Sequence, residues 1–200
     1  GLVYPCFCTR KEIQQEAARA GQAPHGAEGP LYTGVCRRLS EKERAARLKT
    51  EAPFALRLDV TKGLEKAAAP PSFTEYGRGP QGQNGWIIAQ PEKLGDVILA
   101  RGQANAIQQF SYHLAVVVDD AHQGVTCVTR GQDLFFATPL HCLLQALLCL
   151  QTPAYLHHAL ALDETGKRLA KRHDALNLKQ FRTSGVQPEK IRELALAVLG

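Results

Sequence analysis

The chain has 200 residues, of which 44% are hydrophobic, so it can bury a core in one or two domains. Its 24 lysines and arginines against 19 acidic residues give a formal net charge of +5, which suits a polyanionic partner without requiring one. No apolar run reaches the ~18 residues of a membrane span, and no basic leader precedes an apolar stretch, so we expect a soluble, cytoplasmic protein.

Six cysteines, unevenly placed, do not fit a secreted disulfide scaffold and favour metal binding or reduced thiols. Two of them, Cys6 and Cys8, lie one residue apart in YPCFC, and Cys36 follows in LYTGVCRR. A structural zinc ion takes four ligands in a tetrahedron, mostly sulfur or imidazole. The fourth ligand would be Tyr32, His25 or water, and the alternative interpretation is three unrelated free thiols. The other cysteines lie in apolar sequence, where a cysteine is more often a core residue, and no chemistry is assigned to them: Cys127, Cys142 and Cys149.

Two polar helices are predicted around this third cysteine. TRKEIQQEAARAGQAP reads as a helix that ends at Gly21 and Pro24. SEKERAARLK begins a second helix, because Ser40 and Glu43 have the spacing of a capping box. A basic face of this kind is usually only solvated, and the alternative is contact with a phosphate backbone. Its members are Arg37, Arg38, Lys42, Arg44, Arg47 and Lys49.

The middle of the chain is predicted to contain a strand and a long loop. FALRLDV alternates like a half-buried strand, with one apolar face made of Phe54, Leu56 and Leu58. Residues 67–85 are rich in Gly, Pro and Gln, which indicates a surface loop.

From Phe110 on, the pattern favours a parallel sheet. YHLAVVVDD holds an apolar run from Leu114 to Val118, which predicts a strand buried on both faces, and GVTCVTRG predicts the next strand. TPLHCLLQALLCL predicts a buried helix with Thr138 as N-cap and Pro139 at the first helical position.

Arg130 stands at the end of the second of these strands. Ligands of open α/β sheets bind beyond the carboxyl ends of strands, so Arg130 is a candidate site residue, and a salt-bridged structural arginine is the alternative. The later stretch DETGKRLAKRHDA is a cationic loop. Such a loop can deliver positive charge to phosphoryl groups, although solvated charge is its commoner meaning.

In this order, CFCTR, YTGVC, YHLAVVVDD, GVTCVTRGQDL and KRLAKR resemble the class I glutamyl-tRNA synthetase family, and within it most closely the short glutamyl-queuosine tRNA(Asp) synthetases. The resemblance covers nearly the whole chain. It implies an α/β fold, the C-terminal part of a class I Rossmann-type catalytic domain with a zinc-bearing inserted subdomain. Residues 1–109 would form that acceptor-end subdomain with a long loop, 110–155 the second half of the Rossmann-type fold, and 156–200 a KMSKS-like ATP loop and a C-terminal helical segment.

The resemblance also implies site residues. Its Cys-x-Cys and Tyr-x3-Cys pattern matches a zinc site of Cys6, Cys8, Tyr32 and Cys36, with the tyrosine as fourth ligand. Full-length synthetases more often have a histidine where this chain has Arg38, which favours the short paralogue.

Tyr112 and Arg130 match the residues that hold glutamate, the arginine by pairing with a carboxylate. RLAKR matches the ATP loop, with catalytic Lys171 at its second lysine and Arg168 at its first, and with Ala170 in place of its serine. YLHHALAL resembles the strand and turn against adenine, which makes Leu160 an ATP-binding candidate, although Ala159 replaces the usual proline.

The function implied by the resemblance is ATP-dependent activation of glutamate, with Mg²⁺, and transfer of glutamate to the queuosine base of tRNA(Asp) by a monomer that needs Zn²⁺. No HIGH-type motif is found, so we expect the C-terminal two-thirds of an enzyme, which alone cannot form an adenylate. The alternatives are a truncated glutamyl-tRNA synthetase that charges tRNA(Glu) and a non-catalytic zinc-stabilised RNA-binding module. Only 28 residues follow Arg172, too few for the anticodon-binding domain of the former.

Overall fold

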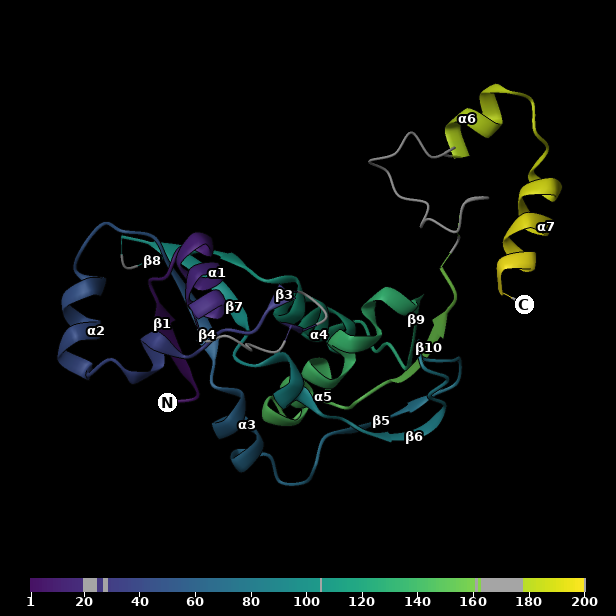
Figure 1. Ribbon diagram of the computed structural model, residues 1–200. Coiled ribbons are helices and arrows are strands. Elements are labelled where there is room, and N and C mark those ends of the chain that lie inside the picture. The colour runs from purple at the N-terminus through teal and green to yellow at the C-terminus, as the bar shows by residue number, and fades with distance from the viewer. Residues whose placement is uncertain (20–24, 27–28, 105, 161, 163–177, 200) are drawn as a thin grey trace. The chain divides into compact units, whose positions relative to one another are not determined.

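The computed structural model describes residues 1–19, 25–26, 29–104, 106–160, 162 and 178–199. The chain forms two compact units, whose helices and strands are labelled in Figure 1. The first unit consists of Gly1–Phe73, Trp86–Thr126 and Phe136–Pro153, and the second consists of Thr74–Gly85, Cys127–Phe135 and Ala154–Gly200.

An antiparallel sheet forms the first part of the first unit. Its strand order is β1-β4-β7-β8, and its members are β1 (Val3–Cys6), β4 (Phe54–Leu58), β7 (Ile98–Gln103) and β8 (Ala106–Phe110). The predicted strand FALRL is confirmed as β4, but it is not half-buried, because side chains on both of its faces are covered. Arg57 is only 7% exposed, since its guanidinium lies over the Tyr32 ring and donates to the Asp96 carbonyl.

Short helices join these strands. The two predicted polar helices are confirmed as α1 (Arg10–Arg19) and α2 (Glu41–Leu48), and the Ser40–Glu43 capping box of α2 is formed in full. Gly34 adopts φ 79°, a left-handed conformation suited to glycine, and starts the short helix η1. The remaining small elements here are β2 (His25–Gly26), β3 (Gly29–Pro30), η1 (Val35–Arg38), α3 (Val60–Lys66) and η2 (Pro91–Leu94).

The stretch YHLAVVVDD is a helix, α4 (Tyr112–His122), and the predicted buried strand is wrong. The Ser111 side chain caps α4 by accepting from the Leu114 N–H. Val117 enters the core while Val118 is 46% exposed, as expected of successive positions on a helix and not of a strand covered on both faces. A β-branched residue destabilises a helix by only a few tenths of a kcal/mol. The Ser111 cap and the packing of Val117 therefore outweigh the strand preference of the valines.

The predicted buried helix is confirmed as α5 (Thr138–Leu147), but its N-cap is Ala137, one residue before the predicted one, without a side-chain cap. Core residues of the first unit gather around it. They are Leu58, Val60, Val97, Leu99, Val117, Leu140, Leu143 and Leu144.

Residues 67–85 are not a surface loop throughout, because Ser72–Glu75 form β5 and Phe73 and Glu75 are buried. A second sheet has the order β6-β5-β10-β9, with β6 (Gly85–Ile88), β9 (Cys127–Gly131) and β10 (Ala154–His158). The predicted strand GVTCVTRG is confirmed as β9, and it pairs in parallel with β10, which also pairs in parallel with β5. Its other predicted strand, YHLAVVVDD, is absent from this sheet because it forms α4. The second unit also holds α6 (Leu178–Thr183) and α7 (Pro188–Leu199), and η3 (Gln132–Ala137) begins in it. Within the described residues, no helix has both the length and the apolar character that crossing a membrane requires.

Candidate functional site

Three cysteine sulfurs of the first unit form a cluster. Cys6 ends β1, Cys8 follows two residues later, and Cys36 lies in η1 after the Gly34 turn. Their Sγ atoms all lie within 4.8 Å of one another, and those of Cys8 and Cys36 are 3.4 Å apart. Sulfurs around a tetrahedral zinc ion with Zn–S bonds of 2.3 Å are about 3.8 Å apart, so the cluster has the dimensions of such a site.

An oxygen lies beside this sulfur cluster. The Tyr32 hydroxyl is 3.6 Å from the Cys8 Sγ and accepts a 2.8 Å hydrogen bond from the Cys36 N–H. The structure thus brings together all four residues that the family resemblance implied. The side chain of His25, the alternative ligand, lies outside the described part of the chain.

The pKa values of the groups in the cluster are shifted in different directions. Burial raises the pKa of the Cys8 thiol to about 12, and burial together with a hydrogen bond to Cys36 also raises the pKa of Tyr32. Burial acts in the same direction on Cys36, but hydrogen bonds from the Tyr32 hydroxyl and the Phe7 N–H outweigh it and lower the pKa of that thiol. A bound dication would displace the remaining protons, because zinc binds thiolates. The donor set therefore fits zinc.

A cavity of about 230 Å³ opens beside the cluster. Its lining includes Cys8, Cys36 and Tyr32 together with Phe7, Ile13 and Arg47. This cavity gives an ion a path to the sulfurs, which a metal site needs.

A buried carboxylate ties the cluster to the neighbouring sheet. Asp96 accepts from the Tyr4 hydroxyl at 2.6 Å, from Arg37 Nη1 at 3.2 Å and from the Val60 N–H at 3.1 Å. Arg37 directly follows Cys36, so η1 is fixed to the strand that carries Cys6.

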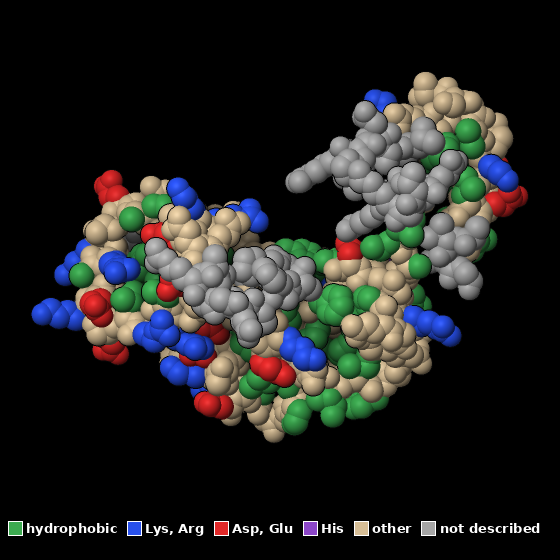
Figure 2. All heavy atoms as spheres, viewed as in Figure 1, with side chains coloured by type: hydrophobic (Ala, Val, Ile, Leu, Met, Phe, Trp, Pro, Cys, Tyr) green, Lys and Arg blue, Asp and Glu red, His purple; other side chains and the backbone are tan. Residues whose placement is uncertain are grey.

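The basic face predicted around α2 is partly used inside the protein. Besides Arg37, Arg44 donates to the Arg37 carbonyl and Arg47 lies over the Phe7 ring. Acidic side chains, Glu41 and Glu43 among them, are interspersed with basic ones over α2 (Figure 2). Structural and solvated charge therefore account for much of this face.

Tyr112, the first predicted glutamate-binding residue, opens α4 and is exposed. Its ring meets those of His113 and His141 edge-on, at 5.7 and 5.9 Å. His113 Nδ1 and the buried His141 Nε2 are 3.1 Å apart. No motif in the sequence indicates this histidine pair, because His141 stands alone among mostly apolar residues of α5.

Arg130, the second predicted glutamate-binding residue, lies near the end of β9 in the second unit, as predicted. Its Nε–H donates to His157 Nε2 at 3.0 Å, and its guanidinium lies 5.1 Å from the centre of the Tyr155 ring. Behind it, His157 Nδ1 is 2.5 Å from Glu75 Oε2. Sequence reasoning missed both Glu75 and His157, since the former fell in a predicted loop.

The other predicted residues have different outcomes. Tyr112 belongs to the first unit and Arg130 to the second. Leu160 follows β10, and its Cδ2 lies 3.0 Å from where a Cβ on Gly131 would stand. Lys171 and Arg168, the predicted ATP-loop residues, lie outside the described residues.

Comparison with known proteins agrees with the family resemblance of the sequence motifs. The family model for tRNA synthetases class I (E and Q), catalytic domain, matches residues 1–199. The chain is 44% identical over 97% of its length to the glutamyl-Q tRNA(Asp) synthetase of Rhodobacter capsulatus. It is 42% identical over all of its length to that of Nocardia farcinica, and 42% identical over 96% to that of Nitratidesulfovibrio vulgaris. The chain spans 66%, 57% and 53% of these three relatives.

Among solved structures, glutamate-tRNA synthetase from Elizabethkingia anophelis is similar with a TM-score of 0.59 and 21% identity, over 86% of this chain and 32% of that one. A glutamate tRNA ligase from Elizabethkingia meningosepticum gives a TM-score of 0.58 and 20% identity, over 92% of this chain and 33% of that one. Both likenesses concern the fold. With a family model that matches 199 of its 200 residues, the chain belongs to the class I tRNA synthetases of the E and Q group, in their catalytic domain.

Proposed function

We propose that the protein containing this chain activates glutamate with ATP and transfers it to the queuosine base of tRNA(Asp). Glutamate and ATP would form glutamyl-adenylate and pyrophosphate, and the acyl group would then pass to the tRNA with release of AMP. The observation that carries the proposal is the 44% identity over 97% of the chain with a protein named glutamyl-Q tRNA(Asp) synthetase. We further propose that it acts as a cytoplasmic monomer and takes ATP with Mg²⁺.

Zinc is the proposed resident metal. Cys6, Cys8 and Cys36 would hold it as thiolates, with the Tyr32 oxygen as fourth ligand, and the sulfur cluster supports this assignment. A site closed by four protein ligands is structural. It would join the turn after β1 to η1 and so fix the shape of the inserted subdomain.

The substrate sites are assigned from the family pattern. Arg130 and Tyr112 would bind glutamate, and the half-buried guanidinium held on one side by His157 supports a role for Arg130 in pairing with a carboxylate. Lys171 and Arg168 would meet the phosphates of ATP, and Leu160 would lie against adenine. Catalysis would then consist mainly of orientation and charge stabilisation.

The proposal is tested with the full-length protein in two assays. Glutamate-dependent ATP–pyrophosphate exchange without tRNA measures activation, and transfer of labelled glutamate to tRNA(Asp) with queuosine, to tRNA(Asp) without it and to tRNA(Glu) measures acceptor choice. We expect exchange without tRNA and labelling only of the queuosine-containing tRNA(Asp). Labelling of tRNA(Glu) would overturn the proposal in favour of an ordinary synthetase, and tRNA binding without any exchange would favour the RNA-binding module.

A further inference from the structure

Three side chains of the second unit form a hydrogen-bonded row, named here the Glu75–His157–Arg130 triad. They come from three neighbouring strands, since β10 lies between β5 and β9 and His157 stands opposite Arg130 in the register. His157 Nδ1 is 2.5 Å from Glu75 Oε2, and Arg130 Nε is 3.0 Å from His157 Nε2. Glu75 is 1% exposed and His157 2%, so the row runs from the interior to the half-buried arginine.

The chemistry of the groups fixes the direction of these hydrogen bonds. An arginine nitrogen can only donate, so His157 Nε2 accepts and the ring proton of neutral His157 is on Nδ1. That proton is donated to the Glu75 carboxylate. Glu75 Oε1 accepts from the backbone N–H groups of Gly77 and His157, each at 2.8 Å. The carboxylate is therefore anchored by main-chain donors and sets the tautomer of the histidine.

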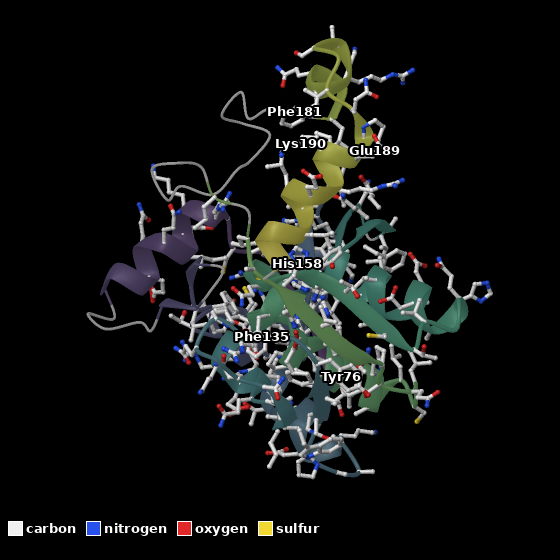
Figure 3. The ribbon with its side chains drawn as sticks, turned by 90° about the vertical axis from the view of Figure 1, so that its right-hand side faces the viewer. Tyr76, Phe135, His158, Phe181, Glu189 and Lys190 are labelled. Atoms are coloured by element: carbon white, nitrogen blue, oxygen red, sulfur yellow. The ribbon has the colours of Figure 1, made fainter. Side chains whose placement is uncertain are left out.

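Aromatic rings hold the row in place. Tyr155 stacks on His157 at 5.8 Å with an interplanar angle of 8°, and it also lies under the Arg130 guanidinium. Phe135 meets His157 edge-on at 5.1 Å and is labelled in Figure 3, as is His158, the neighbour of His157 on β10. The hydrogen bond from Nε to His157 and the Tyr155 ring beside one face both constrain the plane of the guanidinium. In the proposed function, the substrate carboxylate would pair with the terminal amino groups of this plane in a fork geometry.

We propose that Glu75 and His157 are positioning residues that orient Arg130 for the carboxylate of the amino-acid substrate. This inference rests on the proposed function, in which Arg130 binds glutamate. Glu75 would act only through His157, by keeping Nε2 free of hydrogen so that it can accept from Arg130. A loss of that acceptor turns the guanidinium and weakens glutamate binding, without touching the residues proposed for ATP.

Glu75→Gln is the sharpest test, because it keeps the shape of the side chain. The amide oxygen must stay at the Oε1 position, where two backbone N–H groups point, so the NH₂ group faces His157 Nδ1. His157 then has to accept at Nδ1 and carry its proton on Nε2, opposite the Arg130 Nε–H. Nitrogen-15 NMR of the ring should show the Nδ1–H tautomer in the wild type and the Nε2–H tautomer in the variant.

Steady-state kinetics of the full-length protein give the functional readout. Loss of a hydrogen bond to a charged group predicts that Glu75→Gln raises the KM for glutamate about 10- to 100-fold. The KM for ATP should stay unchanged, and kcat should change less than about threefold, since uniform binding is lost. A glutamate KM equal to that of the wild type, or an unchanged tautomer, would overturn the inference.

Two substitutions of His157 keep the test decisive if Glu75→Gln does not fold. The asparagine amide can replace the Nδ1–H donor to Glu75, but it leaves no acceptor for Arg130. The longer glutamine side chain can place its amide oxygen near Nε2, where it accepts from Arg130, but it leaves no donor to Glu75. We expect His157→Asn to raise the glutamate KM as Glu75→Gln does, and His157→Gln to rescue most of it. Equal KM values for the two variants would overturn the inference and leave His157 a purely structural residue.

A final comparison separates this inference from the proposed function. In the Arg130→Ala background, Glu75→Gln should add no further increase in glutamate KM, because the two residues act on one contact. If Arg130→Ala alone leaves the glutamate KM unchanged, the proposed role of Arg130 fails and the inference fails with it. If Arg130→Ala raises the KM and Glu75→Gln does not, only the positioning role is wrong.

Discussion

Arg57 covers the ring of Tyr32, with its guanidinium carbon 4.0 Å from the ring centre, while its Nη1 donates to the Asp96 carbonyl at 2.7 Å. One buried arginine thus connects the proposed oxygen ligand of the metal to the carboxylate-bearing loop that holds Arg37. The candidate metal centre is therefore packed onto the antiparallel sheet through Arg57 and Asp96, which are not themselves proposed metal ligands.

We predict that Arg57→Met destabilises the first unit by about 1–3 kcal/mol, through loss of a cation–π contact and of a charge-assisted hydrogen bond. Arg57→Lys should recover only part of this, because an ammonium lacks the planar fork. Arg101→Lys, at an exposed position of the neighbouring β7, is the matched control and should change the free energy of unfolding by less than about 0.5 kcal/mol. Urea unfolding of the three variants measures the differences, and equal stabilities would contradict the prediction.

Zinc content is the direct check on the sulfur cluster. We expect about one zinc per chain in purified protein and none in Cys36→Ser, because a closed site needs each of its thiolates. Cys142→Ser is the matched control, since both cysteines are 1% exposed and Cys142 belongs to α5.

Elemental analysis of zinc in the wild type and in these variants tests the assignment. Wild-type protein without metal, as stable as protein given zinc, would refute the site. Tyr32→Phe should lower zinc affinity less than Cys36→Ser does, because three thiolates remain. If Tyr32→Phe keeps full affinity, the fourth ligand is not the tyrosine.

Some of these features were predictable because they are local in sequence. The capping box of α2 needs only Ser40 and Glu43. The three cysteines were candidate ligands from their motifs, and the family resemblance implied that they share one site. The helix α4 was not predicted because its three valines are typical of a strand. Its helical structure depends on the Ser111 cap and on the core around Val117.

The Glu75–His157–Arg130 triad could not be predicted for a different reason. Its members are separated by 82 and 27 residues and meet only when β10 pairs with two other strands. Nothing local marks a glutamate in a Gly- and Pro-rich stretch as buried. Contacts of this kind follow from strand order, which periodicity alone does not determine.

The stability of the second unit should depend on pH through His157. Burial lowers the pKa of His157 below the ordinary 6.5, with a further contribution from the Arg130 cation and from His158, although Glu75 raises it. Below about pH 6.5 the unfolded chain therefore binds a proton that the folded chain does not. This part of the stability is complete above that pH and is lost as the pH falls toward the folded-state pKa.

Urea unfolding between about pH 7.5 and about pH 5 tests this expectation, with the slope of stability against pH as the readout. The slope should decrease in His157→Gln, because the titrating ring is gone. His122→Gln, at the exposed end of α4, is the control and should keep the wild-type slope. Identical slopes in wild type and His157→Gln would contradict the prediction.

Lys171 is predicted to meet the phosphates of ATP. In the full-length protein, Lys171→Ala should slow glutamate-dependent ATP–pyrophosphate exchange by a factor on the order of 100 or more, as expected for the loss of one aimed charge. Zinc content should stay the same. Lys190→Ala, which removes an exposed lysine of α7 paired with Glu193, is the control and should leave exchange unchanged. Normal exchange in Lys171→Ala would remove the ATP-loop interpretation of RLAKR.

Replacement of Gly77 by alanine should disturb the triad through the backbone of β10. A Cβ at Gly77 would overlap the His157 carbonyl oxygen and stand 2.9 Å from the His157 nitrogen, so β10 has to move if the residue becomes alanine. Because those atoms belong to the main chain beside His157, Gly77→Ala should raise the glutamate KM about tenfold or more in the full-length protein, besides lowering stability.

Gly82→Ala in the same loop is the matched control for this change. Gly82 has φ +83° and open space around it, so alanine there costs about 1 kcal/mol of backbone strain but displaces no neighbour. Its glutamate KM should equal that of the wild type. If the two alanine variants lose stability and glutamate affinity to the same extent, the close approach of Gly77 to His157 has no specific role, and the loop acts on the site only through general destabilisation.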